Sequence, residues 1–311
     1  MTEMSNTVLI TGAGGFLGCA LYDRLKHSAE IIGVDIVDAP AVWCHRWIKG
    51  SYSDLSAHIL NGVDVVVHSA WMGLPGDDGN AASDLARNVL PSLELYSRCC
   101  IAGVKRFVFL SSGGTVYGDS VTLPTYENNQ LSPLNTYGAG KASVEIFLRA
   151  LGGRKECVPV ILRIANPYGP GQLPWRGQGV IPTAIACAIT GKTFTMWGDG
   201  VNIRDYIYVA DASDAIAALS LAAEASGVYN VASGEGRSLN QVIAEVENVV
   251  GNHLNICREP SRAGDVSANV LSIERISHDL NWRPKVGFQE GITHCVVWLK
   301  KNHDRWAYNN N

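Results

Sequence analysis

A tyrosine and a lysine four residues apart form the pair in this sequence that is best suited to move a proton. Tyr137 and Lys141 lie in 137-YGAGK-141. On a helix, residues at i and i+4 share one face, so both heads can converge on one ligand. A phenol with a pKa near 10 is a poor base, and lowering that pKa by roughly 3 units requires about 4 kcal/mol of differential stabilisation. An adjacent ammonium and a positively charged ligand can supply it. The pair predicts proton transfer; the alternative is two surface side chains.

A hydroxyl-rich segment, 111-SSGGTVYG-118, precedes this helix. Ser112 and Thr115 are its candidate catalytic hydroxyls. Side chains alternate along an extended strand, so Ser112 is expected to point away from the side chain position of Gly113. A bend at the double glycine would instead let Ser112 or Thr115 approach the tyrosine. We therefore keep both hydroxyls as candidates.

A glycine-rich turn near the start of the chain, 11-TGAGGFLG-18, is typical of dinucleotide binding. Gly12 permits a tight turn, Gly15 lets backbone amides reach a pyrophosphate, and Gly18 allows close packing of helix and strand. The amides and the helix dipole then bind the phosphates. Asp35 ends the next strand about 20 residues on, where its carboxylate would accept hydrogen bonds from a ribose and repel a 2′-phosphate. The turn predicts binding of NAD rather than NADP; the alternative is an ordinary strand–helix turn.

The elements that must position these residues alternate along the first half of the chain. Short β-branched runs occur at residues 7–11, 31–35, 63–70, 106–112 and 158–165. Amphipathic stretches such as Phe16 to Lys26 and Asn88 to Ala102 lie between them. Apolar strands separated by helices indicate a parallel sheet that is covered on both faces. We therefore predict an α/β fold with a doubly wound parallel sheet of the Rossmann type.

The pattern changes after about Pro167, where loops rich in glycine and proline join short helices and isolated strands. We predict an NAD-binding Rossmann domain over residues 1–166. Residues 167–311 are expected to form mainly a smaller, mixed substrate-binding lobe. The strand 228-VYNVA-232 is expected to return to the main sheet.

Composition excludes several classes of protein. With 311 residues, 47% hydrophobic, the chain can form a substantial core. A net charge of −4 without a Lys/Arg cluster argues against nucleic-acid binding. No apolar run reaches about 18 residues, so no membrane span is expected, and the polar start MTEMSN predicts no signal peptide.

The eight cysteines and eight histidines show no metal-ligand spacing, so we expect no metal site. Cysteines without framework spacing suit a reducing compartment, and the cytoplasm is the expected location. His68, at a strand end, is expected to be structural rather than catalytic.

Together these motifs resemble the extended short-chain dehydrogenase/reductases. Within that group the chain is similar to the NAD-dependent nucleotide-sugar epimerase/dehydratase family. Among its members, the motifs resemble those of UDP-hexose 4-epimerases most. The resemblance rests on the glycine turn, Asn88 in 85-LARNVLPS-92, the SSGGTVYG segment and YGAGK, and it spans about Thr7 to Lys300. It implies an NAD-dependent isomerase of carbohydrate metabolism. Such an enzyme inverts C4 of UDP-glucose or UDP-N-acetylglucosamine through a transient 4-keto sugar while NAD stays bound.

The resemblance also implies a homodimer, formed through the helices near residues 88–102 and 137–151. On the cofactor side it adds contacts to Tyr137 and to Lys141, which would bind the nicotinamide ribose. The remaining cofactor residues implied are Phe16, Leu17, Ala70, Asn88 and Ser111.

On the substrate side the resemblance implies a clamp for the nucleotide diphosphate. The residues that would contact phosphate and ribose are Asn166, Arg204 and the pair of Arg262 and Asp265. The planar guanidinium groups of the two arginines suit phosphate oxygens. Trp197 would lie beside the uracil, its alternative being a core tryptophan.

Val180 and Thr195 complete the implied substrate contacts. Asn269 stands where some relatives carry a bulky tyrosine, which implies room for N-acetylated sugars.

Three departures from the family pattern bear on the reaction. Gly113 stands where similar epimerases carry a Ser or Thr that hydrogen-bonds the sugar O4, a donor worth about 1–3 kcal/mol. Ser51 or Tyr52 replaces an aspartate that lies against the adenine. Dehydratases need an Asp–Glu pair where this chain has Gly114 and Thr115, which disfavours dehydration.

Two other functions remain open. A reductase of a nucleotide-linked 4-keto sugar would share Tyr137 and Lys141 but release its cofactor, and Asp35 disfavours the NADPH that such enzymes use. A non-catalytic NAD-binding scaffold would suit Gly113, but not an intact tyrosine–lysine pair.

Overall fold

The central element of the structure is a parallel seven-stranded sheet. The structure is a computed structural model that describes residues 6–41, 43, 45–74, 80–119, 122–152, 156–261 and 265–307. The strand order is β10-β6-β5-β4-β1-β2-β3, and every neighbouring pair is parallel. The strands are β1 (Thr7–Thr11), β2 (Glu30–Asp35), β3 (Arg46–Lys49), β4 (Val65–His68), β5 (Arg106–Ser112), β6 (Val158–Ile164) and β10 (Gly227–Val231).

This sheet confirms the predicted doubly wound α/β fold. The strand expected at 228–232 is β10, which pairs with β6. Strand β3 is not among the predicted strands; it is a four-residue edge strand of sequence RWIK whose side chains are only half-buried or exposed. A short edge strand with two charged residues carries no apolar run, and so it leaves no signal in the sequence.

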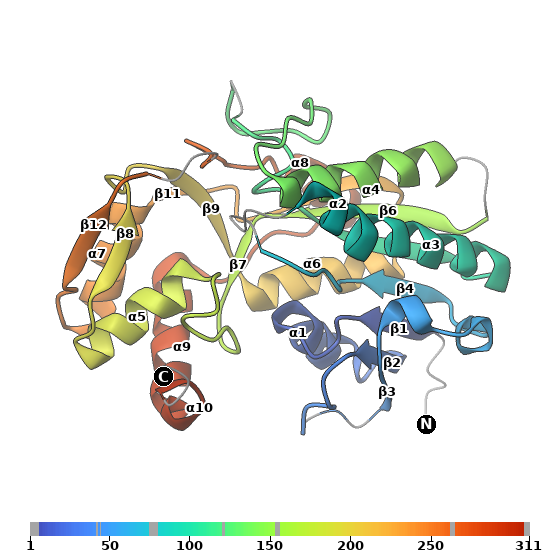
Figure 1. The fold of residues 1–311 in the computed structure, drawn as a ribbon, viewed down its shortest axis with the longest axis horizontal. Coiled ribbons are helices and arrows are strands. Elements are labelled where there is room, and N and C mark those ends of the chain that lie inside the picture. The colour runs from blue at the N-terminus through green and yellow to red at the C-terminus, as the bar shows by residue number, and fades with distance from the viewer. Residues whose placement is uncertain are drawn as a thin grey trace.

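Helices cover both faces of the sheet (Figure 1). Side chains alternate along each strand. Val8 and Ile10 therefore point into a core shared with helices α1 (Phe16–Leu25) and α6 (Val209–Leu221), whereas Leu9 points into a second core with α3 (Leu90–Ala102) and α4 (Thr136–Gly152). The sheet is thus buried on both faces, as a parallel sheet requires.

The helix that the sequence places at Asn88 to Ala102 begins differently in the structure. A short helix α2 (Ala81–Asp84) leads into a π-helical turn (Leu85–Val89), and α3 follows without a break. The helix ends at Gly103, which has a φ of 77°, a left-handed C-cap that glycine adopts at no steric cost. In the parts of the chain that the structure describes, no helix is long and apolar enough to cross a bilayer.

A smaller lobe follows the sixth strand and has its own core. It lies beside the carboxyl edge of the large sheet, at the left of Figure 1. Helices α5 (Val180–Thr190), α7 (Leu239–Val250) and α9 (Phe288–Lys301) form most of that core. The other elements after β6 are β7 (Asn166–Tyr168), β8 (Phe194–Trp197), β9 (Ile203–Tyr208), β11 (Gly236–Ser238), β12 (Ile256–Glu259), α8 (Glu274–Leu280) and α10 (His303–Ala307).

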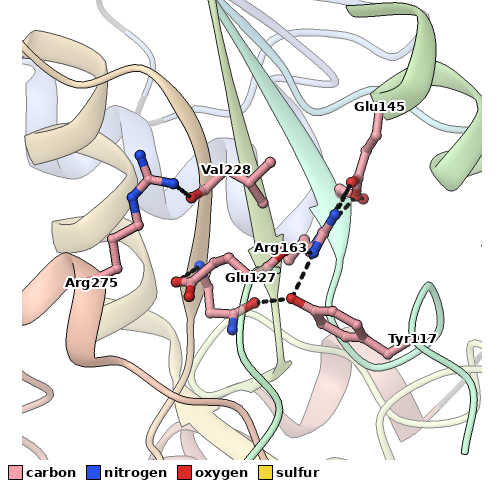
Figure 2. Close-up of polar contacts among 8 residues, drawn as sticks. Tyr117, Glu127, Glu145, Arg163, Val228 and Arg275 are labelled. Carbon is pink, nitrogen blue, oxygen red and sulfur yellow. Dashed lines mark hydrogen bonds and ion pairs between the residues drawn. The ribbon is translucent and has the colours of Figure 1, made fainter. Parts of the chain in front are cut away.

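A buried ion pair attaches α4 to the central sheet. Arg163 on β6 donates to both carboxylate oxygens of Glu145 on α4, with Nε–Oε1, Nε–Oε2 and Nη2–Oε2 distances of 3.2, 2.9 and 2.7 Å. Both side chains are buried, and the Ser111 hydroxyl on β5 donates to the same carboxylate. Figure 2 shows that Arg163 also reaches Tyr117, whose hydroxyl accepts from Nη1 at 2.8 Å.

This network continues on the far side of the tyrosine. Tyr117 donates to Oδ1 of Asn230 on β10 at 2.7 Å, and the backbone N–H of Asn230 donates to Glu127 at 3.0 Å (Figure 2). The backbone carbonyl of Glu127 in turn accepts from Arg163 at 2.9 Å. Every charge in this interior is therefore paired or hydrogen-bonded, which is the condition for burying one.

Arg163→Met is expected to lower the free energy of unfolding by about 3–5 kcal/mol, because it leaves the Glu145 carboxylate buried without its cation. Lys105→Met is the matched control, since it removes an exposed cation from the pair Lys105–Asp64 and should change stability by at most about 1 kcal/mol. Urea unfolding followed by circular dichroism measures both. Equal losses in the two variants would contradict a structural role for the buried pair.

Candidate active site

A cavity of about 790 Å³ opens at the carboxyl edge of the sheet, and both lobes contribute residues to its wall. The strand order reverses at β1, which has β2 on one side and β4 on the other. In doubly wound sheets, such a reversal leaves a crevice beyond the strand ends, where ligands bind. The cavity therefore lies where this topology places a ligand site.

The glycine turn forms one wall of this cavity and is packed too tightly for side chains. Gly12 has a φ of 68°, and a Cβ there would lie 2.8 Å from the Cα of Ala70. A Cβ on Gly18 would collide with the carbonyl oxygen of Gly12. Gly12, Gly15, Phe16 and Leu17 all line the cavity, whereas Gly18 serves the packing of α1 against the turn. These close approaches leave backbone at the cavity wall, which fits the pyrophosphate of a dinucleotide.

Asp35 lies beside this turn at the end of β2 and also lines the cavity. Its Oδ2 accepts from the backbone N–H of Gly14 at 2.9 Å. The carboxylate is thus held at the cavity wall, where a ribose hydroxyl can donate to it. Ser51 and Tyr52, which stand in place of the expected adenine-binding aspartate, line the cavity as well.

The tyrosine and lysine of α4 also line this cavity. Tyr137 and Lys141 both line the cavity, together with Ala70, Ser111 and Ser112. Lys141 is only 3% exposed. Its Nζ donates to the carbonyl of Leu110 at 2.7 Å and lies 5.9 Å from the ring centroid of Tyr137. The helical spacing therefore brings the two heads to one wall, as the sequence predicts.

The protein alone does not make Tyr137 acidic. Burial raises the pKa of Tyr137 to about 12, and a hydrogen bond with the Ser112 hydroxyl offsets only part of this rise. Burial also lowers the pKa of Lys141 to about 7, although the Glu145 carboxylate opposes that shift. If Tyr137 is to act as a base near neutral pH, further positive charge in the cavity, such as that of a bound oxidised cofactor, would have to lower its pKa.

The structure corrects the expected orientation of the SSGGTVYG segment. Side chains do alternate at the end of β5, but Ser112 faces the cavity and Tyr137. A Cβ on Gly113 would instead collide with the side chain of Leu271 and lie 3.1 Å from the carbonyl oxygen of Arg163. The glycine therefore faces the core rather than the cavity, and no cavity hydroxyl is missing at that position.

Thr115 lies outside the cavity wall. Its hydroxyl is buried and has no hydrogen-bond partner among the described residues. Its Cβ packs against α4 at Gly138, where an added Cβ would lie 3.2 Å away. Of the two candidate hydroxyls, the structure brings only Ser112 to the tyrosine.

Most of the residues assigned to the sugar nucleotide line the same cavity, at the end formed by the smaller lobe. Arg204 Nη2 lies 3.7 Å from Oδ1 of Asp265, and Asn166 Nδ2 donates to the carbonyl of Asp205 at 2.9 Å. Trp197 is 41% exposed, which excludes the core-tryptophan alternative. The cavity-lining members of this set are Asn166, Val180, Thr195, Trp197, Arg204 and Asp265, while Arg262 lies outside the described residues.

Asn269, which was assigned to the substrate, is buried away from the cavity wall. Asn269 is fully buried, and its Nδ2 donates to the carbonyl of Gly113 at 3.0 Å. Its backbone N–H donates to Ile203, which holds this segment inside. Asn269 therefore does not shape room for an N-acetyl group, and that expectation was wrong.

Asn88, expected to contact the cofactor, instead binds the chain after β4. Its amide accepts from the backbone N–H of Met72 and donates to the carbonyl of Met72, both at 2.8 Å. These paired bonds fix the segment that carries Trp71, a cavity residue that the sequence analysis missed. The signal was its position directly after Ala70, beyond the end of a strand.

His68 at the end of β4 has the structural role expected of it. It is fully buried between the hydroxyls of Thr11 at 2.7 Å and Ser92 at 2.8 Å. Burial lowers the pKa of His68 to about 3, so the ring is neutral at physiological pH. Within the described ranges, no group of three His, Cys, Asp or Glu side chains is placed to hold a metal ion.

Comparison with known proteins identifies the family of this chain. Residues 8–232 match the NAD dependent epimerase/dehydratase family. The dTDP-4-dehydro-6-deoxyglucose reductase of Escherichia coli is 31% identical over 318 residues, covering 96% of this chain and 99% of that protein. The UDP-glucose 4-epimerase of Mycolicibacterium smegmatis is 29% identical over 309 residues, covering 94% and 98%.

A similar solved structure is that of a UDP-glucose 4-epimerase from Thermotoga maritima with UDP-glucose. It superposes with a TM-score of 0.88 at 28% identity, covering 96% of this chain and 99% of that chain. NAD is the cofactor of the matched family, as the glycine turn and Asp35 predict. The chain belongs to the NAD-dependent epimerase/dehydratase family.

Proposed function

We propose that the protein inverts C4 of a UDP-hexose, of the UDP-glucose or UDP-N-acetylglucosamine type, through a transient 4-keto sugar. One observation carries this proposal. Ser112, Tyr137 and Lys141 share a single cavity with the dinucleotide turn at one end and the residues assigned to the sugar nucleotide at the other. A sugar bound between those ends would present a carbinol to the tyrosine.

The chain's own contribution to this reaction is proton transfer and positioning. NAD, when bound, supplies the acceptor and later the donor of the hydride at C4. Tyr137, as phenolate, takes the proton of the 4-hydroxyl, so that the O–H bond breaks while C4 loses its hydride and becomes a carbonyl carbon. Ser112 partly offsets the rise in the pKa of Tyr137, lines the same cavity and can donate to the same sugar oxygen. Lys141, while charged, favours the phenolate electrostatically.

The second half of the reaction needs the sugar to turn over without leaving. Asn166, Arg204 and Asp265, with Trp197 beside the base, would retain the nucleotide while the 4-keto sugar rotates. Tyr137 then returns its proton to the oxygen on C4, and hydride arrives on the other face. Because the second half reverses the first, the reaction would need no net supply of cofactor.

The proposal also covers the oligomeric state of the protein and its place in the cell. Helices α3 and α4 expose Leu90, Ile101, Ile146 and Phe147, each at least half exposed, and such side chains suit burial against a second copy. We therefore propose a homodimer through these helices. The cysteines in the described residues are all free, which suits a cytoplasmic protein.

A second candidate function is reduction of a nucleotide-linked 4-keto sugar. It is favoured by the similarity along nearly the whole chain to the Escherichia coli reductase. Tyr137 would then donate its proton to the 4-keto oxygen in a single step. Such an enzyme would use one reduced cofactor for each product formed.

Incubation of the purified protein with UDP-glucose, and separately with UDP-N-acetylglucosamine, is expected to give the C4 epimer without added cofactor. Tyr137→Phe should lower kcat by at least about 100-fold, because it removes the proton acceptor. Proton NMR of the sugar and absorbance at 340 nm measure epimer and reduced cofactor together. Reduced cofactor that accumulates without epimer would contradict epimerisation. A reductase would form no epimer here and would consume added reduced cofactor only with a nucleotide-linked 4-keto sugar.

Ser112→Ala is expected to lower kcat by about 10- to 100-fold, the effect of losing one hydrogen-bond donor worth about 1–3 kcal/mol. Thr115→Val is the matched control, because it removes a buried hydroxyl without a partner and should leave kcat within about twofold. Initial rates of epimer formation test both. The assignment fails if the threonine variant loses more activity than the serine variant.

Gly113→Ser is not expected to raise activity, because a Cβ there faces Leu271 and the carbonyl of Arg163. Overpacking should instead lower the free energy of unfolding by about 1–3 kcal/mol. Gly114→Ala is the control, since its Cβ would meet Asn166 Oδ1 at an ordinary 3.5 Å. A stable Gly113→Ser enzyme with a higher kcat would show that position 113 does face the sugar.

A further inference from the structure

We propose that Trp71 is a positioning residue that holds the Lys141 ammonium against the face of its indole ring. The inference rests on the proposed function, because it concerns the lysine assigned to that site. Lys141 Nζ lies 4.0 Å from the ring centroid of Trp71. It lies farther from the rings of Phe109, at 4.9 Å, and Tyr137, at 5.9 Å.

Several contacts fix the position of this indole. Asn88 holds the backbone of the next residue, Met72, through two hydrogen bonds. On the α4 side, a Cβ on Gly140 would lie only 3.0 Å from Trp71 Cζ2, so the glycine leaves the space that the ring uses. The ring also packs edge-on against Tyr137, with centroids 6.0 Å apart and planes at 72°. Trp71 therefore contacts both members of the proton-transfer pair.

The ammonium needs such a contact because its other neighbours supply little negative charge. The carboxylate of Glu145, one turn along α4, is already paired with Arg163. His68 on β4 is neutral, and Tyr137 is protonated in the protein alone. Among the described residues, Nζ contacts the Leu110 carbonyl and the electron-rich faces of the aromatic rings. A cation–π contact is strongest where water is excluded, as it is around this buried lysine.

The expected consequence is a change in the charge of Lys141 near neutral pH. Burial lowers the pKa of Lys141 to about 7. Replacing the indole by an apolar side chain that keeps Nζ buried withdraws an interaction that only the charged form makes, so the pKa falls further. At neutral pH less of the lysine is then charged, and Tyr137 loses its positive neighbour.

The pKa of Lys141 can be measured directly in protein that carries 13C-labelled lysine ε-carbons, with Lys141→Met identifying the resonance. Trp71→Leu is expected to lower that pKa by about one unit, and Trp71→Phe by less, because the smaller ring keeps part of the interaction. Trp175→Leu is the matched control. It removes the ring that lies 5.1 Å from Lys192 Nζ and should leave the Lys141 titration unchanged.

This titration uses no substrate, so it is independent of the proposed reaction. A lowered Lys141 pKa in a protein that forms no epimer would leave the inference standing and reject only the proposed function. Equal Lys141 pKa values in the folded wild type and Trp71→Leu would overturn the inference. If Trp71→Leu does not fold, tetrafluorotryptophan incorporation weakens the ring's negative face at nearly constant shape. The same pKa fall is then expected, and an unchanged pKa overturns the inference.

In an active enzyme, the pH profile of kcat/KM separates positioning from a general structural effect. The limb that falls as Lys141 loses its proton should move to lower pH in Trp71→Leu, by the shift seen in the titration. Trp71→Phe should recover most of the wild-type profile. A uniform loss at every pH with unmoved limbs would overturn the positioning role.

Discussion

The attachment of α4 to the sheet by the buried Glu145 carboxylate is the interaction on which the rest of the site depends. Glu145 accepts from Ser111 on β5 and from Arg163 on β6, so one carboxylate joins the helix to two strands. Lys141 lies one helical turn before it and Tyr137 a turn earlier. Because Ser111 is next to Ser112, the same contact sets the strand end and the helix face that meet in the cavity. Its cost is a buried charge, which the Arg163 network offsets.

Burial then creates a second constraint, which concerns charge. Exclusion of water from Tyr137 and Lys141 raises the pKa of the tyrosine and lowers that of the lysine. Neither shift favours a phenolate beside an ammonium. In the proposed reaction the site would depend on its ligands, because a bound oxidised cofactor would bring the positive charge that favours a phenolate. Trp71, as proposed above, stabilises the charged form of Lys141. Without that contact the lysine would lose its proton more readily near neutral pH, because its pKa is lowered to about 7.

The features that the sequence predicts best are those determined by residues close together along the chain. The glycine turn, Asp35, the helical Tyr137–Lys141 spacing and the strands of the main sheet all follow from local periodicity and from backbone geometry. The orientation of Ser112 does not, because the packing of Leu271 and Arg163 decides which side of the strand end faces the cavity.

Distant contacts also account for the two corrected asparagines. Asn269 is held inside by Ile203, and Asn88 by the backbone of Met72. Alignment to a family places such residues along the chain but not relative to the cavity. Trp71 was missed for the same reason, since its partner Lys141 lies on a different element.

The most direct test of the central claim follows one hydrogen atom. UDP-glucose deuterated at C4 is incubated with the protein without added cofactor, and the product is examined by NMR. If Tyr137 and Ser112 serve a reaction in which hydride leaves and returns within one cavity, the epimer keeps its deuterium at C4. Deuterium lost to solvent, or recovered on released cofactor, would contradict the account.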